Sequence, residues 1–184
     1  RKYCDGGQCI RLYKTFMKKK DPEAANIVMG HNEEDLLGLG TIFSLLAYKK
    51  LYDGEYHPKQ CVILEQELKI VIELSAAVPV NVSCGNSDFY LSVNGYEARM
   101  LVHLKEGKLR QYYRNYKDYE FILGEDTAMP KSITRYMDKS LKIATTPQTC
   151  YTWFNCDEDF LNNEKKQMQY LTHTLPFFLD NLNK

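Results

Sequence analysis

Between Cys61 and Leu74, apolar and charged residues alternate along the chain. From residue 64 onward, the even positions are mostly apolar and the odd positions are mostly charged. Because successive side chains of a β-strand point to opposite faces, this period of two predicts a half-buried strand. The run is long for a single strand, so we expect a bend or a bulge within it.

A helix with a wide apolar surface is predicted just before this strand. Asn32 can cap its start, acidic residues fill its first turn, and Gly54 can end it. A helix whose apolar residues spread this widely is mostly buried, so we expect it to cover the apolar face of residues 61–74. Its apolar residues are Leu36, Leu37, Leu39, Ile42, Phe43, Leu45, Leu46, Ala47, Leu51 and Tyr52.

Two shorter helices are predicted nearer the N-terminus. One begins near Ile10 and ends in a run of lysines, whose charge suits the negative end of a helix dipole. The other begins at Pro22, directly after a capping aspartate, and we expect Gly30 to end it.

The best-specified local element is a hairpin over residues 89–104. Its centre, Asn94-Gly95, is typical of a two-residue type I′ turn. In that register Leu91 faces Ala98, and the other cross-strand pairs on the same face are also apolar. The turn signal and the burial pattern therefore favour the same hairpin.

Further strands are predicted on both sides of this hairpin. Pro79 cannot donate a backbone hydrogen bond, so the valine-rich segment 78–83 should be an edge strand. Segments 109–116 and 119–123 would extend the hairpin into an antiparallel meander.

A helix near the C-terminus completes the predicted fold. It begins at Asp157, and we expect Pro176 to break or restart it. Together these elements predict one α+β domain over residues 1–184. In it, N-terminal helices and the C-terminal helix pack on an antiparallel sheet of about five or six strands.

Composition excludes a strong global charge. The chain has 24 basic and 24 acidic residues, so no net field attracts it to nucleic acid or to an anionic membrane. No stretch approaches 18 uninterrupted apolar residues, so we expect no membrane span. The sequence starts with Arg1, which suits a mature chain whose signal peptide has been removed, or an excised ectodomain.

Six cysteines suggest a disulfide framework, since an even number is typical of secreted proteins. They are Cys4, Cys9, Cys61, Cys84, Cys150 and Cys156. The sequon at Asn81 predicts a glycosylation site and fits the same secreted or extracellular location. The alternatives are six free thiols in a cytosolic protein with a chance sequon, or a zinc site, for which the cysteine spacings are loose. The sequence alone does not determine which of the fifteen possible disulfide connectivities of six cysteines would form.

No catalytic signature is present in the chain. His31 with Glu33, Glu34 and Asp35 could bind a metal or act as acid and base, but we interpret this cluster as a solvated loop leading into a helix. We therefore predict no catalysis, no metal and no cofactor.

The most suggestive surface is a predicted strand with two arginines and two tyrosines on one face: Arg110, Tyr112, Arg114 and Tyr116. Arginine and tyrosine are enriched at binding hot spots, and they also suit anionic sugars or single-stranded nucleic acid. An ordinary solvent-facing sheet surface would carry the same residues.

From these observations we predict a secreted, disulfide-stabilised glycoprotein that binds an extracellular protein partner through the arginine and tyrosine face. We expect no nucleic-acid partner. The alternative function is a carrier of a small apolar, lipid-like ligand in a cavity between the sheet and the helices, lined by residues 36–52 and 177–179.

Overall fold

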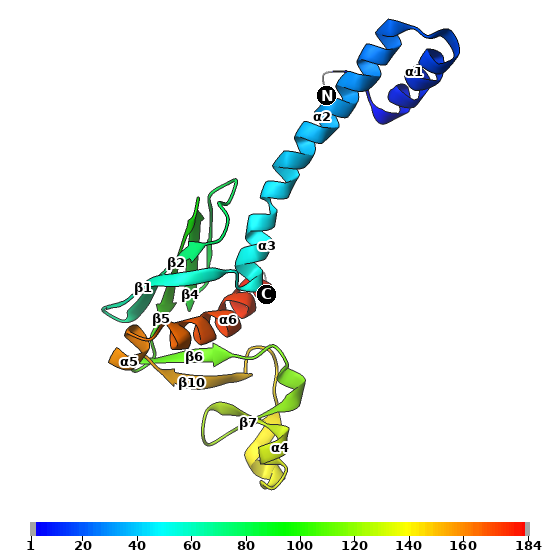
Figure 1. Ribbon diagram of the computed structural model, residues 1–184. Helices are drawn as coiled ribbons and strands as arrows, with labels where there is room; N and C mark the ends of the chain where they lie inside the picture. The colour runs from blue at the N-terminus through cyan, green and yellow to red at the C-terminus, as the bar shows by residue number, and fades with distance from the viewer. Residues whose placement is uncertain (1–2, 183–184) are drawn as a thin grey trace. The chain divides into compact units, whose positions relative to one another are not determined.

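The computed structural model describes residues 3–182 of the chain (Figure 1). The chain divides into two compact units, Arg1–Leu46 and Ala47–Lys184. That the chain forms a single domain stays a prediction. The mixed α+β fold is confirmed, and its elements are α1 (Gly6–Lys19), α2 (Pro22–Ser44), α3 (Leu46–Asp53), β1 (Tyr56–Leu64), β2 (Glu67–Leu74), β3 (Val82–Gly85), β4 (Phe89–Asn94), β5 (Glu97–His103), β6 (Lys108–Tyr112), η1 (Tyr116–Asp118), β7 (Tyr119–Ile122), β8 (Thr127–Pro130), α4 (Lys131–Thr134), η2 (Lys139–Leu141), β9 (Lys142–Ala144), β10 (Tyr151–Asn155), α5 (Glu158–Leu161) and α6 (Glu164–Asp180).

The first unit consists of α1 and α2, which pack against each other. Asp5 caps α1 and Asp21 caps α2, with Pro22 at the first helical position as predicted. Gly30 does not end a helix, which corrects that prediction. A Cβ atom there would lie 2.6 Å from ring atoms of Tyr3, so the glycine permits close packing of this ring on α2.

The predicted helix over residues 32–54 is also wrong in its limits. Asn32 lies inside α2, and the helix breaks near Leu45, after which α3 begins. Ala47 and Leu51 of α3 belong to the core of the second unit. The large apolar side chains of α2 are instead exposed, namely Met29, Leu36, Leu37, Leu39, Ile42 and Phe43.

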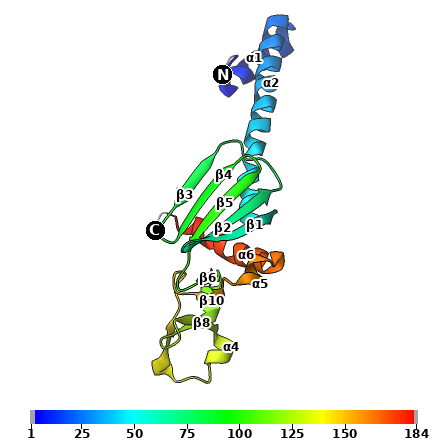
Figure 2. The ribbon, with the colours of Figure 1, turned by 90° about the vertical axis from the view of Figure 1, so that its left-hand side faces the viewer.

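A five-stranded antiparallel sheet forms the centre of the second unit, with strand order β1-β2-β5-β4-β3 (Figure 2). The stretch from Cys61 to Leu74 divides between β1 and β2, and Glu65 takes a left-handed conformation in the turn, with φ 57°. The predicted alternation within β2 is confirmed. Its buried residues are Leu68, Ile70, Ile72 and Leu74.

Helix α6 lies between this sheet and the two-stranded sheet of β6 and β10 (Figure 1). The Phe178 ring lies 5.4 Å from that of Phe89 in β4, while the Phe177 ring stacks on Tyr112 in β6 at 3.7 Å. Pro176 is buried inside α6 and does not end it, contrary to the prediction. The helix that covers the sheet is therefore C-terminal, aided by α3 and α5.

The hairpin of β4 and β5 forms in a different register from the predicted one. Leu91 pairs with Met100 instead of Ala98. The turn holds Gly95 and Tyr96, and Gly95 has φ 55° at the first central position, where a type II′ turn favours glycine. Compared with the predicted register, each residue of β4 pairs with a residue two positions further along β5. A shift of two residues leaves the same side chains on the buried face.

The predicted antiparallel meander does not continue past β5, which corrects the prediction for residues 109–123. Strand β6 pairs with β10, and β7 lies between β8 and β9 in a separate three-stranded sheet. Segment 78–80 is outside any strand, but β3, which starts at Val82, is an edge strand next to β4.

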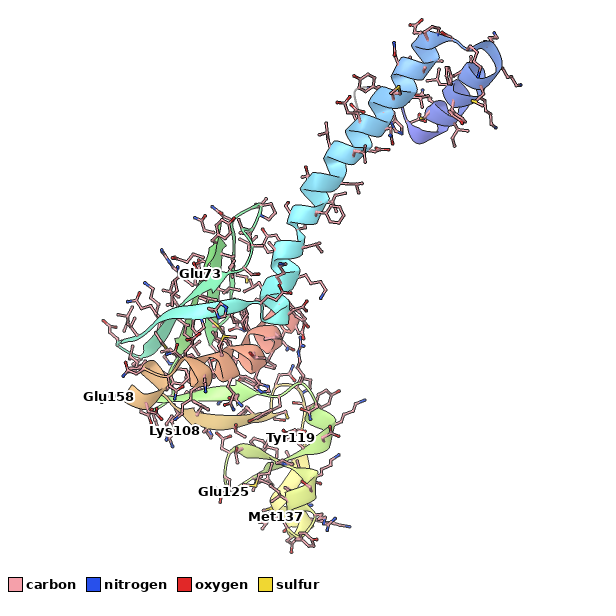
Figure 3. The ribbon with its side chains drawn as sticks, in the orientation of Figure 1. Glu73, Lys108, Tyr119, Glu125, Met137 and Glu158 are labelled. Carbon is pink, nitrogen blue, oxygen red and sulfur yellow. The ribbon has the colours of Figure 1, made fainter. Side chains whose placement is uncertain are left out.

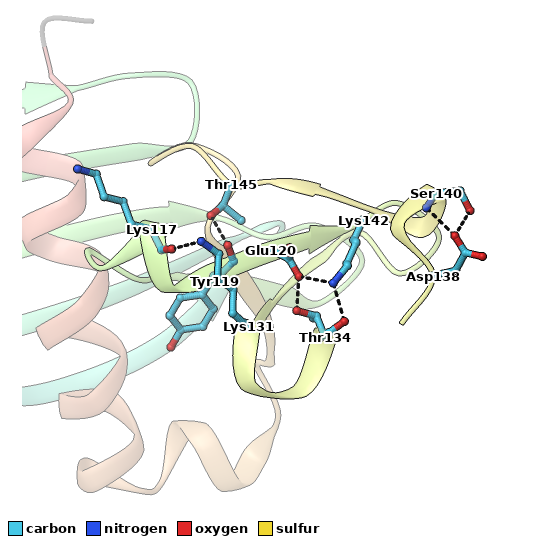
Figure 4. Close-up of polar contacts among 9 residues, drawn as sticks. All are labelled: Lys117, Tyr119, Glu120, Lys131, Thr134, Asp138, Ser140, Lys142 and Thr145. Carbon is cyan, nitrogen blue, oxygen red and sulfur yellow. Dashed lines mark hydrogen bonds and ion pairs between the residues drawn. The ribbon is translucent and has the colours of Figure 1, made fainter. Parts of the chain in front are cut away.

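Polar contacts hold the three-stranded sheet together (Figure 4). Lys142 Nζ donates to Glu120 Oε2 at 2.8 Å and to the Thr134 carbonyl oxygen at 2.6 Å, and the Thr134 hydroxyl also donates to Glu120. These hydrogen bonds from Lys142 and Thr134 hold the pKa of Glu120 below its ordinary value. They join β7, β9 and α4.

Candidate binding site

Of the four predicted partner-binding residues, Arg110 and Tyr112 share a face of β6 and are hydrogen-bonded to each other. Arg114 and Tyr116 lie outside the strand, which corrects the geometry behind that prediction. Strand β6 ends at Tyr112, Arg114 follows in a loop, and Tyr116 begins η1. Tyr112 is only 4% exposed because it packs between β10 and α6, so it is a core residue. Arg110 and Arg114 therefore belong to two separate sites.

Arg114 is held by contacts within the second unit. Its guanidinium lies 4.7 Å from the ring centre of Tyr52 in α3, donates to the Tyr52 hydroxyl, and lies 3.4 Å from Asp180 Oδ2 in α6. The Tyr52 hydroxyl donates to Asp180 Oδ1 at 2.9 Å, and this bond raises the pKa of Tyr52. Arg114 and Tyr116 also line a pocket of about 230 Å³. Arg114 thus links α3 to α6.

Arg110 stacks against two aromatic rings of β10. Its guanidinium carbon lies 4.6 Å from the ring centre of Tyr151 and 5.1 Å from that of Trp153, which is its cross-strand partner. The Tyr151 hydroxyl donates to Asp126 Oδ1 at 2.7 Å, and Trp153 Nε1 donates to the Asp126 carbonyl oxygen at 2.9 Å. The β7–β8 turn therefore fixes both rings.

Arg110, Asp126 and Trp153 line a cleft of about 660 Å³, which we call the Arg110 cleft. Its walls come from the β5–β6 turn, the start of β6, the β7–β8 turn and β10. Figure 3 shows Lys108 and Glu125 on two of these walls. The lining residues are His103, Leu104, Lys105, Glu106, Lys108, Arg110, Glu125, Asp126 and Trp153.

Cations in the Arg110 cleft are not neutralised by ion pairs within the described part of the chain. Lys105, Lys108 and Arg110 have no carboxylate oxygen within 4.0 Å there. Arg110 Nε is buried and has no hydrogen-bond acceptor among the residues described. Burial, together with the hydrogen bond to Asp126, raises the pKa of Tyr151 to about 12, so its hydroxyl is a neutral donor at pH 7.

The sequence did not identify Tyr151 and Trp153 as site residues. The available signal was their alternation after Cys150, since Trp153 is the single tryptophan of the chain and shares a strand face with Tyr151. Nothing in the sequence indicated that this segment pairs with β6, because about forty residues separate them.

The cysteines are six free thiols in the structure, and disulfide formation stays a prediction. Cross-strand pairing places Cys61, Ile70, Met100, Leu91 and Cys84 in one row across the large sheet. Four strand spacings of about 4.8 Å separate Cys61 from Cys84, so these two cannot bond to each other in this fold.

Asn81 is exposed directly before β3, where a glycan could extend into solvent. Its side chain lines a surface pocket of about 490 Å³ together with Ser92 and Arg99. Glycosylation of Asn81 stays a prediction.

The acidic cluster near His31 lies in the middle of α2, so it is not the loop that we predicted. His31 is 7% exposed, and its Nε2 lies 3.4 Å from Asp35 Oδ2 one helical turn away. Within residues 3–182, no group of three or more potential ligands has a geometry suited to a metal ion.

Comparisons with known proteins give one partial match. Residues 1–47 match a model of the RNase_H superfamily, named RNase_H_2. That is 47 of 184 residues, and it does not include the Arg110 cleft. No curated protein matches the chain, and no solved structure does. Within the described residues, no helix is both long enough and apolar enough to cross a membrane.

Proposed function

We propose that this chain is a secreted, disulfide-stabilised, non-catalytic binding protein and that the Arg110 cleft receives an acidic segment of an extracellular protein partner. The observation that carries the proposal is the position of Arg110, which is stacked on Tyr151 and Trp153 and lines the cleft. Arginine and tryptophan supply much of the binding energy at protein interfaces.

The lining of the cleft carries three cations and three carboxylates, Glu106, Glu125 and Asp126, so its net charge is zero, and the case for an acidic ligand rests on the cations placed around Arg110. Lys105 and Lys108 are exposed beside Arg110 and have no ion-pair partner in the described chain. A carboxylate bound next to Arg110 could accept two parallel hydrogen bonds from the guanidinium, and the lysines would add attraction at the rim. Glu125 and Asp126 on the opposite wall would repel a strongly acidic ligand from that side, which favours an acidic segment that also carries neutral residues.

A nucleic-acid ligand is the second candidate for the same cleft. The partial match of residues 1–47 to the RNase_H superfamily favours a nucleic-acid ligand for the chain as a whole, but the match lies outside the cleft. Phosphates would contact the cations, and a base could stack on Trp153.

The apolar-ligand carrier has less support. Side chains fill the space between the large sheet and α6, where Ile70, Leu175 and Phe178 have no exposed surface. A filled core leaves no room there for a lipid-like molecule.

Trp153 makes a direct test possible, because the fluorescence of the single tryptophan reports on the cleft. We expect a peptide of alternating glutamate and leucine to change this fluorescence on titration. Arg110→Ala should weaken the binding about tenfold or more, as expected for a hot-spot residue. The double variant Lys105→Gln with Lys108→Gln should also weaken it without removing a buried contact.

Arg99→Ala is the matched control, because Arg99 pairs with Glu97 on the exposed face of the large sheet. Binding that is the same for Arg110→Ala and Arg99→Ala would contradict the proposed site. A single-stranded oligothymidylate in place of the peptide tests the second candidate. Salt-sensitive binding of the oligonucleotide, together with no response to the peptide, would favour nucleic acid over a protein partner.

A further inference from the structure

Cys4 and Cys9 lie at the start of α1 in a geometry that brings their side chains together. The Asp5 carboxylate accepts the backbone N–H of Gln8 at 2.7 Å, and Gln8 Oε1 accepts the backbone N–H of Asp5 at 3.1 Å. This capping box makes Cys4 the residue before the cap and Cys9 the fourth residue of the helix. Side chains at these two positions pack on each other across the first helical turn.

The surroundings of the two thiols agree with this geometry. Cys4 is only 7% exposed, while Cys9 is half-buried. Burial raises the pKa of the Cys4 thiol, and the neighbouring Cys9 thiol raises it further. Gly6 and Gly7 lie between the cysteines, and their backbone can adjust with little steric cost to the separation that a disulfide needs.

We propose that Cys4 and Cys9 form a reversible disulfide that covalently fastens the N-terminal end of α1. This is a modification site in the first unit, and it does not depend on the Arg110 cleft. The bond would replace a packing contact between two side chains by a covalent link across the capping box.

The oxidant is a small-molecule disulfide such as oxidised glutathione. The more accessible Cys9 thiolate attacks one sulfur of that disulfide, which releases one small thiolate and leaves a mixed disulfide on Cys9. The Cys4 thiolate then attacks Cys9 Sγ and releases the second small thiolate. Two protein thiols lose two electrons and two protons, and one small disulfide gains them to become two thiols.

The other four cysteines are less suited to this reaction. Cys61 and Cys84 stand on opposite edge strands of the large sheet, whereas Cys61 lies near enough to Cys156 for the two thiols to interact, which makes Cys61–Cys156 the competing pair. Burial raises the pKa of Cys61 to about 12 and those of Cys150 and Cys156 to about 11. Burial also raises the pKa of Cys4, so what favours the Cys4–Cys9 pair is the contact between the two side chains and the accessibility of Cys9. The first disulfide to form should therefore join Cys4 to Cys9.

Peptide mapping of the whole chain tests this proposal. The reduced protein would be equilibrated with increasing ratios of oxidised to reduced glutathione, blocked with an alkylating reagent, digested without reduction and analysed by mass spectrometry. We expect the first species that lacks two hydrogens to contain a Cys4–Cys9 cross-link. Cys4→Ser should retain glutathione on Cys9, and Cys84→Ser should leave the Cys4–Cys9 cross-link unchanged.

The proposal would be overturned by molecules that contain a cross-link between any other pair while Cys4 and Cys9 carry the alkylating reagent, which marks them as still reduced when the sample was blocked. So would stable glutathione adducts on both Cys4 and Cys9 in the unsubstituted chain. Ligand binding by Trp153 fluorescence is measured separately, and its result does not change the outcome of the mapping.

Discussion

The large and small antiparallel sheets of the second unit are stabilised by different interactions. In the large sheet, the central side chains Ile70 and Met100 have no exposed surface. In the small sheet of β7, β8 and β9, the strands are three or four residues long, and their buried apolar residues are Ile122 and Ala128, while Ile143 is 49% exposed. The two charged residues in these strands, Lys142 and Glu120, have side chains that are 11% and 23% exposed.

This difference shows why strands of the large sheet were predicted from the sequence with their buried faces, whereas for the small sheet the strand over residues 119–123 was predicted but not its partners. Apolar burial is non-directional and repeats every second residue of a strand, so it leaves a periodic signal. A hydrogen-bonded ion pair depends on distance and angle between particular groups. Glu120 and Lys142 are 22 residues apart, and no local sequence pattern predicts the hydrogen bond between them.

The largest expected effect comes from removing apolar volume in the large sheet. Ile70→Ala should lower the free energy of unfolding by about 2–5 kcal/mol, because it leaves a cavity in a close-packed core. Ile143→Ala makes the same chemical change on an exposed strand of the small sheet and should alter it by at most about 0.5 kcal/mol. Urea denaturation measures both values, and similar losses in the two variants would break the comparison.

A smaller effect is expected from the polar contacts of the small sheet. Thr134 is completely buried, and its hydroxyl donates to Glu120. Thr134→Val keeps the shape but removes this donor, and it should cost about 1 kcal/mol of unfolding free energy. The exposed neighbour Ile133 supplies the control Ile133→Val, which should be nearly neutral. A more stable Thr134→Val protein would show that the polar contacts do not stabilise the sheet.

The smallest effect should depend on pH. The pKa of Glu120 is lowered in the folded state, so its ionised form stabilises the fold above the unfolded-state pKa of about 4.3. This stabilisation is lost as the pH falls through the folded-state pKa. We therefore expect the unsubstituted chain to be more stable than Glu120→Gln at pH 7, with a gap that closes in acid.

Urea midpoints at several pH values measure this gap. Glu125→Gln in the exposed β7–β8 turn is the control, and it should show no such closing. A gap for Glu120→Gln that stays constant from neutral pH into acid would contradict the role of the ionised carboxylate.

The candidate site was only partly predictable. The sequence predicted Arg110 as a candidate binding residue because arginine beside tyrosine is typical of hot spots, and this role stays a prediction. It placed Tyr112 on the same exposed face, but that side chain is buried under Phe177 of α6. It missed Trp153, because the pairing of β6 with β10 joins segments far apart in the chain.

The sequence by itself determined the α+β class, the buried face of β2, the presence but not the register of the hairpin of β4 and β5, and the capped start of α2 at Asp21. Each of these features depends on residues that are close together in the chain, so their spacing and capping chemistry can be recognised in the amino-acid sequence. Only the tertiary structure decided that α6 covers the large sheet, that the strands of the second unit form three sheets, and that Arg110 meets Trp153. Those outcomes depend on which distant apolar surfaces and polar groups fit together, and side-chain packing over long separations leaves no period in the sequence.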